Sequence, residues 1–331
     1  MSSLDQLAST AEERPTQSFG TPTRSRPVRA TTALAAVFTA GAFGSASTAS
    51  AIPVWFTDNG WAQIYNEGFA NTASLSDWSQ YRPEGATGGS GTGRYTSNAV
   101  SVENGKLVID AYSNGNIDHV GSLRSDQSWT YGYFEARIKF KTKSGMHQAF
   151  WMMPDGKNHG DNNGTRPDLN GAEIDIVEHR IVDGDGNNIG DDYWTANHWG
   201  GYGANHQSRG KLNLNKTGND QWHTYGVQWN QDMFKFFIDD TYVGHTINDG
   251  ISGTAEYAIF SNNIGVGWAG TVQNSYGPKG DPGGKMEVDW FRVWQPGAAA
   301  VAIPEPASVG LAAVCSMGLL ARRTRRSGTI A

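Results

Sequence analysis

The sequence predicts an all-β fold in which two sheets pack face to face as a sandwich. Short runs of apolar and β-branched residues recur along the chain, and Gly, Asn and Asp separate them. No long stretch has the 3.6-residue periodicity of an amphipathic helix. The chain has 331 residues, 18% of them charged and 11% aromatic, which is enough for one domain with a large core.

Residues 1–51 have the features of a secretory signal peptide behind a long polar leader. A basic run with Arg24, Arg26 and Arg29 precedes an apolar stretch of small residues. Ala49-Ser50-Ala51 follows as an A-x-A cleavage site. We therefore expect export of the protein, with cleavage after Ala51.

Residues 52–296 make up the single domain that we expect between the two ends of the chain. Asn104-Gly105 separates two strand signals and predicts a hairpin turn. The Gly-rich segments 85–93 and 155–171 have no strand pattern and are expected to be surface loops. The expected strands include 99–102, 106–111, 132–139, 149–153, 173–178, 194–198, 223–229, 234–238, 257–260 and 286–294.

One of these strands carries three acids, Glu173, Asp175 and Glu178. Glu173 and Asp175 are two residues apart and therefore point to the same face of a strand. Strict alternation would place the next acid at 177, so we expect a β-bulge that returns Glu178 to that face. Like charges on one face oppose folding, which favours a chemical use for them. A calcium cluster or a solvated acidic strand are the alternatives.

Cleavage of a glycoside with retention needs a carboxylate nucleophile and a protonated carboxylic acid about 5 to 5.5 Å apart. A third acid between them could share a proton and push the pKa values of the outer two apart. Glu173 and Glu178 would lie roughly 13 Å apart along an ideal strand, even with the bulge discounted. Only a strongly bent sheet would bring these two acids together.

The segment Glu173-Ile-Asp-Ile-Val-Glu178 resembles the catalytic signature of glycoside hydrolase family 16 in its bulged form, as in laminarinases and agarases. The unbulged form of the lichenases lacks the extra residue. Residues 131–139, 148–154, 222–229 and 288–294 resemble successive strands of the same family, and the resemblance covers about residues 60 to 296. It implies a curved, concanavalin A-like jelly roll with a concave substrate cleft. It also implies a retaining O-glycosyl hydrolase with Glu173 as nucleophile, Glu178 as acid/base and Asp175 as the assisting acid.

The resemblance further suggests residues that bind sugar or metal. His198 and Trp199 resemble the strand beside the acidic one, and Trp151 resembles a tryptophan of the cleft floor. Asn98 and Arg124 match positions that bind sugar hydroxyls; burial in the core or solvation of a loop are the alternatives for these five residues. The chemistry needs no cofactor. The family often carries a structural calcium, for which Glu67 and Asp289 occupy comparable places, although Asp289 could equally accept hydrogen bonds from a neighbouring loop.

The substrate predicted is a β-linked polysaccharide, with β-1,3- or 1,3-1,4-glucan preferred and endo-acting cleavage. Residues 52–296 hold 18 basic and 28 acidic residues, a net charge of −10, which excludes nucleic acid and disfavours a heavily sulfated polymer. The alternatives are a β-galactanase of the agarase, porphyranase or carrageenase type, a transglycosylase, or a non-catalytic carbohydrate-binding surface protein. Residues 166–172 lack the tryptophan that is usual in laminarinases, and the loop with Tyr202 and His206 matches no single specificity.

The C-terminus carries a second targeting signal after a linker at residues 297–303. Pro304-Glu305-Pro306 precedes apolar residues 307–321 and a cluster of arginines that ends at Arg326. Residues 304–326 resemble the PEP-CTERM sorting segment, which implies a sorting protease of the exosortase type, transient membrane association through 307–321, and a final extracellular, cell-surface or outer-envelope location. A short tail anchor is the alternative, although the apolar stretch falls short of the roughly 20 residues of a full span. The single cysteine, Cys315, lies here, so the exported domain has no disulfide and is no thiol enzyme.

Overall fold

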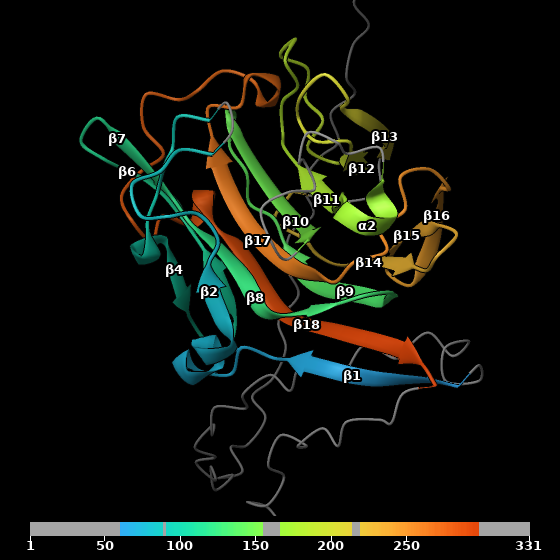
Figure 1. Ribbon diagram of the computed structural model, residues 1–331. Helices are drawn as coiled ribbons and strands as arrows, with labels where there is room; N and C mark the ends of the chain where they lie inside the picture. Colours follow the sequence, from blue (N-terminus) through green and yellow to red (C-terminus); the bar gives the residue numbers. More distant parts are fainter. Residues whose placement is uncertain (1–59, 89–90, 155–165, 214–218, 298–331) are drawn as a thin grey trace, which may run out of the picture. The chain divides into compact units, whose positions relative to one another are not determined.

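The computed structural model describes residues 60–88, 91–154, 166–213 and 219–297. The predicted signal peptide and the predicted PEP-CTERM segment lie outside these residues. Within them the fold is all-β, as predicted, with two large antiparallel sheets (Figure 1). The helices described are one short α-helix, α2 (Pro167–Asn170), and four short 3₁₀-helices at 72–77, 97–99, 267–269 and 282–284.

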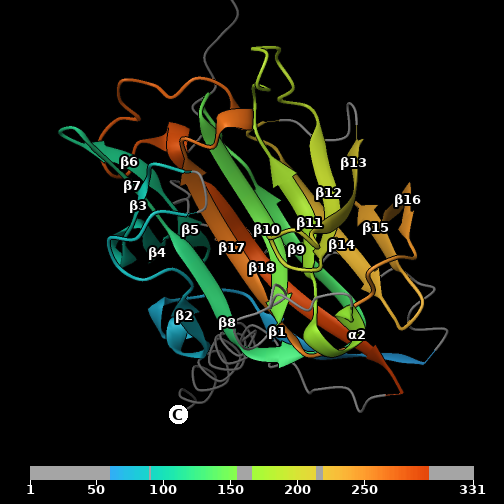
Figure 2. The same cartoon turned by 45° about the horizontal axis from the view of Figure 1, so that its top comes forward.

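The first sheet, which we call the cleft sheet, has seven strands within the described residues. Figure 2 shows its central strands side by side. In spatial order they are β13 (Gln207–Asn213), β12 (Tyr193–Trp199), β11 (Glu173–His179), β10 (Met146–Pro154), β17 (Glu256–Ile264), β8 (Ser122–Trp129) and β2 (Trp78–Gln80).

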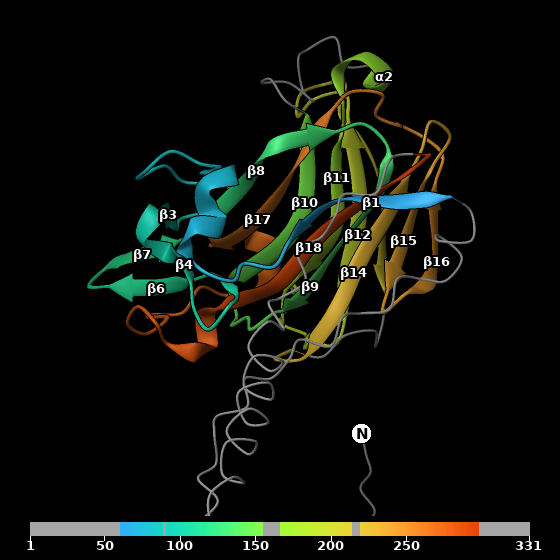
Figure 3. The same cartoon turned by 90° about the horizontal axis from the view of Figure 1, so that it is seen from below.

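The second sheet, which we call the back sheet, packs against one face of the cleft sheet, and the core lies between them (Figure 3). Its strands in spatial order are β16 (Thr241–Ile247), β15 (Phe234–Ile238), β14 (Trp222–Trp229), β9 (Gly132–Lys139), β18 (Met286–Pro296), β5 (Leu107–Ile109) and β4 (Val100–Val102), with β1 (Trp61–Glu67) also paired to β18. A small third sheet consists of β3 (Arg94–Tyr95), β7 (Ile117–Val120) and β6 (Ala111–Asn114).

The core lies between the two large sheets and is rich in aromatic side chains. Phe150 of β10 stacks on Phe260 of β17 with ring centroids 4.9 Å apart, and both contact Phe291 of the back sheet. All three side chains are fully buried. Burial of large aromatic residues supplies much of the hydrophobic free energy of a sandwich that has no disulfide within the described residues.

The predicted hairpin at Asn104-Gly105 is confirmed between β4 and β5. Both residues have positive φ (52° and 70°), as the two central positions of a type I′ turn require. Glu103 and Lys106 exchange backbone hydrogen bonds across the turn. The part of the chain that the structure describes contains no helix long and apolar enough to cross a membrane.

Candidate active site

A cleft of about 580 Å³ opens on the face of the cleft sheet that points away from the core. Its floor comes from β10, β11 and β17, and its walls come from the loops that join the strands. The residues that line it are Tyr81, Arg82, Gly88, Tyr95, His147, Ala149, Trp151, Glu173, Asp175, Glu178, Tyr202, Ser261, Asn263, Val266 and Trp268.

All three predicted catalytic acids line this cleft because β11 contains the expected bulge. Asp175 pairs with Trp151 of β10 and Glu178 pairs with Ala149, which leaves one extra residue, Ile176, on β11 between them. The ladder to β12 breaks at the same place. Ile174, Ile176 and Val177 point into the core instead, where each is at most 1% exposed. The bulge therefore keeps three acids on one face and the aliphatic residues on the other.

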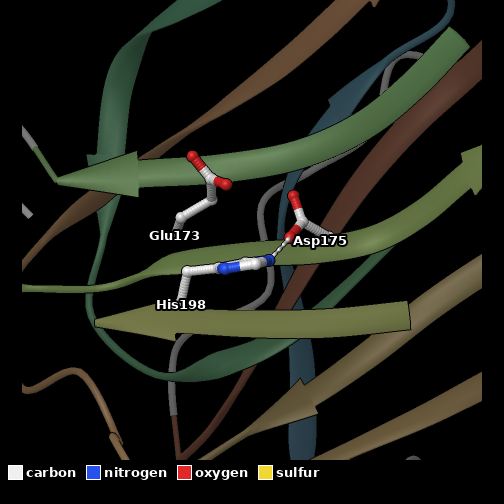
Figure 4. Close-up of side chains that lie close together, drawn as sticks. All are labelled: Glu173, Asp175 and His198. Atoms are coloured by element: carbon white, nitrogen blue, oxygen red, sulfur yellow. Dashed lines mark ion pairs between the residues drawn. The ribbon is translucent and has the colours of Figure 1, made fainter. Parts of the chain in front are cut away.

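Asp175 is buried at the centre of the group and faces a histidine of the neighbouring strand. His198 Nε2 lies 3.3 Å from Asp175 Oδ2, a close contact without good hydrogen-bond alignment (Figure 4). His198 pairs with Glu173 across the ladder from β11 to β12. The Nδ1 atom of His198 is 3.0 Å from Nε2 of His206. His198 was predicted from the sequence, and His206 was not assigned a role.

Glu178 has a histidine partner of its own that sequence reasoning missed. His147 Nε2 lies 3.0 Å from Glu178 Oε1, again as a close contact and not as an aligned hydrogen bond. The His147 ring packs edge-on against Trp268 at a centroid distance of 4.5 Å. The predicted strand began at 149, whereas β10 begins at Met146, and extending the period of two by one step would have placed His147 beside Ala149 and Trp151.

Glu173 contacts a tyrosine, and a second buried acid holds the backbone beside it. The hydroxyl of Tyr202 donates a hydrogen bond to Glu173 Oε2. Glu256 of β17 is fully buried, and its Oε1 accepts a hydrogen bond from the backbone N–H of Ala172 at 3.1 Å. Glu256 thus fixes the residue directly before Glu173. A lone glutamate directly before the predicted strand 257–260 gave no signal for this role.

The surroundings favour proton binding by this cluster. Burial, and then the charge of Asp175, raise the pKa of Glu173 to about 8. Burial, and then the charge of Glu178, hold the pKa of Asp175 well above its usual range. Burial also raises the pKa of Glu256 to about 8. Ionising several of these close acids together is therefore costly, and pKa values shifted in this way are typical of sites for acid/base chemistry.

The predicted substrate-binding residues fall into two groups. Trp151 lines the cleft, where its Nε1 donates to Ser261 Oγ at 3.0 Å and Tyr81 packs against its ring. Arg124 does not line the cleft itself; its guanidinium lies 4.7 Å from the ring centroid of Tyr257, and the Tyr257 ring in turn packs against Tyr81 of the cleft.

Trp199 and Asn98 do not line the cleft. Trp199 is 5% exposed and points to the opposite face from His198, as adjacent strand residues must, and it packs closely against Gly250. Asn98 is exposed in the 3₁₀ turn 97–99, and its backbone N–H bonds to Thr96.

The two acids predicted for calcium both have partners within the protein. Asp289 Oδ2 accepts a hydrogen bond from Arg137 at 2.7 Å, so a guanidinium already neutralises it. Glu67 accepts a hydrogen bond from the backbone N–H of Phe69. Calcium binds six to eight oxygen ligands, so Asp289 as placed, with its Oδ2 held by the Arg137 guanidinium, does not fit the predicted site.

Within the described residues, one group of three side chains has its possible ligand atoms close enough together to share a cation. Its members are Glu173, Asp175 and His198, whose candidate atoms lie within 4.8 Å of one another. Glu173 and His198 already hydrogen-bond to Tyr202 and His206, and Asp175 contacts His198. Each of these side chains thus has a partner within the protein.

Two family models match the chain. The model described as glycosyl hydrolases family 16 matches residues 90–292, which include the whole acidic strand. The model described as the PEP-CTERM protein-sorting motif matches residues 302–326. Both resemblances found in the sequence are thereby confirmed.

Curated relatives are similar to the chain at modest identity. The clotting factor G alpha subunit of Tachypleus tridentatus is 28% identical over 71% of this chain and 34% of its own length. A beta-glucanase of Rhodothermus marinus is 28% identical over 52% of this chain and 60% of its own. Beta-porphyranase C of Zobellia galactanivorans is 25% identical over 73% of this chain and 78% of its own. The chain thus spans less than two thirds of the first two relatives.

A solved structure shares the fold. A glycoside hydrolase family 16 endo-glucanase from Bacteroides ovatus superposes with a TM-score of 0.57 over 70% of this chain and 99% of that one, at 24% identity. The predicted jelly-roll sandwich is confirmed by this likeness.

Proposed function

The chain belongs to glycosyl hydrolase family 16, and we propose that it is an exported, endo-acting hydrolase that cleaves β-linked polysaccharide with retention. The observation that carries the proposal is the placement of Glu173, Asp175 and Glu178 in one cleft, each with its own polar partner. Retention by double displacement needs one carboxylate to attack and one carboxylic acid to donate a proton.

In the first step Glu178 donates its proton to the glycosidic oxygen while a carboxylate oxygen of Glu173 attacks the anomeric carbon. The bond between that carbon and the leaving oxygen breaks, and a glycosyl ester forms on Glu173. In the second step Glu178, now ionised, removes a proton from water, and the water oxygen replaces Glu173. A protonated Asp175 remains between the two and donates a hydrogen bond, which favours ionisation of the acid beside it.

The two histidines have separate places in this scheme. His147 contacts Glu178 and can therefore hold the carboxyl group of the acid/base in position during both steps. His198 contacts Asp175 and therefore controls where the shared proton of the cluster lies. A cation bound to the carboxylates would occupy the oxygens that both steps use, so we propose no catalytic metal.

The aromatic residues of the cleft suit a polymer. Tyr81, Trp151 and Trp268 line the floor and the walls, and flat rings of this kind pack against the apolar C–H faces of sugars. Cleavage within a chain needs binding on both sides of the scissile bond. The cleft is lined by residues of several strands and loops, which can bind sugars on both sides of the scissile bond.

We propose β-1,3- or 1,3-1,4-glucan as substrate, supported by the similarity to a beta-glucanase and by the acidic domain. A β-galactan of the porphyran type is the second candidate, because Arg82 in the cleft could pair with an anionic sugar and a porphyranase is among the relatives. Release of reducing ends from laminarin, mixed-linkage glucan, agarose, porphyran and carrageenan distinguishes the two. Lengthened products would reveal transglycosylation.

We further propose that the C-terminal motif directs the exported enzyme to a sorting protease of the exosortase type. The apolar residues 307–321 would hold the protein at the membrane until that protease removes them. The catalytic domain would then act outside the cell or on its envelope. Mass spectrometry of the protein from the native envelope would locate the cut near Pro304.

The experiment that tests the catalytic assignment uses Glu173→Gln and Glu178→Gln. We expect each to lower kcat by at least about 10³-fold while the folded protein still binds the polysaccharide. Glu287→Gln on the back sheet, where Glu287 pairs with Lys139, is the matched control and should hydrolyse normally. Azide should rescue Glu173→Ala and yield a glycosyl azide. Normal hydrolysis by Glu173→Ala would exclude the proposal, and binding without any reducing ends in the wild type would indicate a carbohydrate-binding protein.

A further inference from the structure

We propose that Tyr202 is a positioning residue for Glu173. The loop 200–206 holds two members of the catalytic group in place, Glu173 through Tyr202 and His198 through His206. This inference rests on the proposed function of Glu173 as nucleophile. The loop follows β12 directly, and its contacts reach two different members of the catalytic group.

The first contact is the hydrogen bond from the hydroxyl of Tyr202 to Glu173 Oε2. The loop can turn back over the cleft because Gly200 and Gly201 both adopt positive φ, 79° and 74°, which residues with a Cβ rarely do. Tyr202 as a whole is 63% exposed, so its ring is not held in place by burial in the core. Core packing alone therefore does not explain its position.

The second contact holds the loop in place. The His206 and His198 rings lie edge to edge, with centroids 5.2 Å apart and planes 2° from parallel. Their facing nitrogens are 3.0 Å apart, so one donates and the other accepts. If His198 carries its proton on Nδ1, its Nε2 is left as an acceptor that faces Asp175. The Tyr202 ring also lies 5.8 Å from that of His206.

The consequence for Glu173 is both geometric and electrostatic. A donor fixed on Oε2 leaves Oε1 as the oxygen that attacks the anomeric carbon, and it orients the carboxylate before substrate arrives. The hydrogen bond favours the ionised form, which is the nucleophilic one. The hydrogen bond thus opposes burial and the neighbouring acids, which both raise the pKa of Glu173.

The other titratable groups that influence Glu173 come from four elements. Asp175 and Glu178 on β11 favour the protonated form of Glu173, whereas His198 on β12 favours the ionised form. Glu256 on β17 and Tyr81 in the segment after β2 also interact electrostatically with Glu173. Among these contacts, the hydroxyl of Tyr202 donates directly to the carboxylate.

The test compares Tyr202→Phe with the wild type, using Tyr242→Phe as the matched control. Tyr242 is exposed on the back sheet and bonds to Thr246, away from the cleft. We expect Tyr202→Phe to lower kcat by about 10- to 100-fold with little change in KM, since a hydrogen bond to a charged group is lost. The acid limb of the kcat/KM profile should move to higher pH, because Glu173 loses a contact that favours its ionised form.

A second measurement does not depend on activity. The carboxyl ¹³C signal of Glu173, assigned by its absence in Glu173→Gln, should titrate at higher pH in Tyr202→Phe than in the wild type. An unchanged titration would overturn the inference, as would a change in KM with kcat and the pH profile preserved. A wild type that hydrolyses none of the polysaccharides would instead defeat the proposed function, and the titration would still decide the role of Tyr202.

Discussion

Deletion of Ile176 tests whether the bulge of β11 places the catalytic acids. Without it the strand reads Glu173-Ile-Asp-Val-Glu, in which strict alternation alone keeps all three acids on the cleft face. The later residue His179 also stays on the core side, where it is now fully buried. The deletion should therefore preserve the facing of every catalytic side chain. This is also the unbulged form of the family signature.

The cost of the deletion falls on stability. Ile176 is 1% exposed in the core, and removing such a side chain costs about 2 to 5 kcal/mol. Closing the bulge restores ladder hydrogen bonds worth about 1 kcal/mol each, which offsets part of the loss. We expect the free energy of unfolding to fall by about 1 to 4 kcal/mol, while measurable hydrolysis remains.

Urea denaturation gives the free energy of unfolding, and reducing-end assays give the hydrolysis per folded molecule. The matched control inserts one alanine between Ile176 and Val177. Strict alternation then still keeps Glu178 on the cleft face, but it moves Glu178 two positions along β10, about 7 Å further from Glu173. That variant should lose hydrolysis as completely as Glu178→Gln does. A fully active insertion variant, or a folded deletion variant with no hydrolysis at all, would refute the role of the bulge.

Three further predictions follow from buried or paired groups. The fold favours the protonated form of Glu256, with a pKa of about 8, so the free energy of unfolding should fall as pH rises from about 4.5 to about 8. The side-chain oxygen in Glu256→Gln can still accept the hydrogen bond from Ala172, and this variant should show a weaker pH dependence of the unfolding free energy in urea titrations. An unchanged pH dependence in the variant would contradict the prediction. His147→Gln should lower kcat about tenfold by removing the contact with Glu178, and steady-state kinetics with KM changed alone would place His147 in substrate binding instead. EGTA should leave the Tm unchanged because Asp289 is paired with Arg137, whereas a fall reversed by calcium would show that the metal binds after all.

The sequence predicted those parts of the site that lie on one strand. Period-two alternation and one out-of-step acid were enough to infer the bulge and the shared face of Glu173, Asp175 and Glu178. The same alternation also shows that His198 and Trp199 must face opposite sides of the sheet. The sequence alone could therefore have shown that they do not both bind the substrate.

Other parts depend on contacts between distant segments. Tyr202 and Glu256 meet the acidic strand only in the folded chain, and neither lies in a pattern that indicates its role. The strands β8 and β13 were not among those expected, because several of their residues are polar and exposed. Pairing with a neighbour, and not intrinsic propensity, makes them strands.

The most direct test of the account is the trapping of the glycosyl-enzyme. A 2-deoxy-2-fluoro oligosaccharide with a dinitrophenolate leaving group slows the second step more than it slows the first, so the covalent intermediate accumulates. The account predicts a single mass increase on the peptide that contains Glu173, and tandem mass spectrometry should locate the sugar on that side chain. A label on another residue, or turnover that inverts the anomeric configuration without any label, would contradict it.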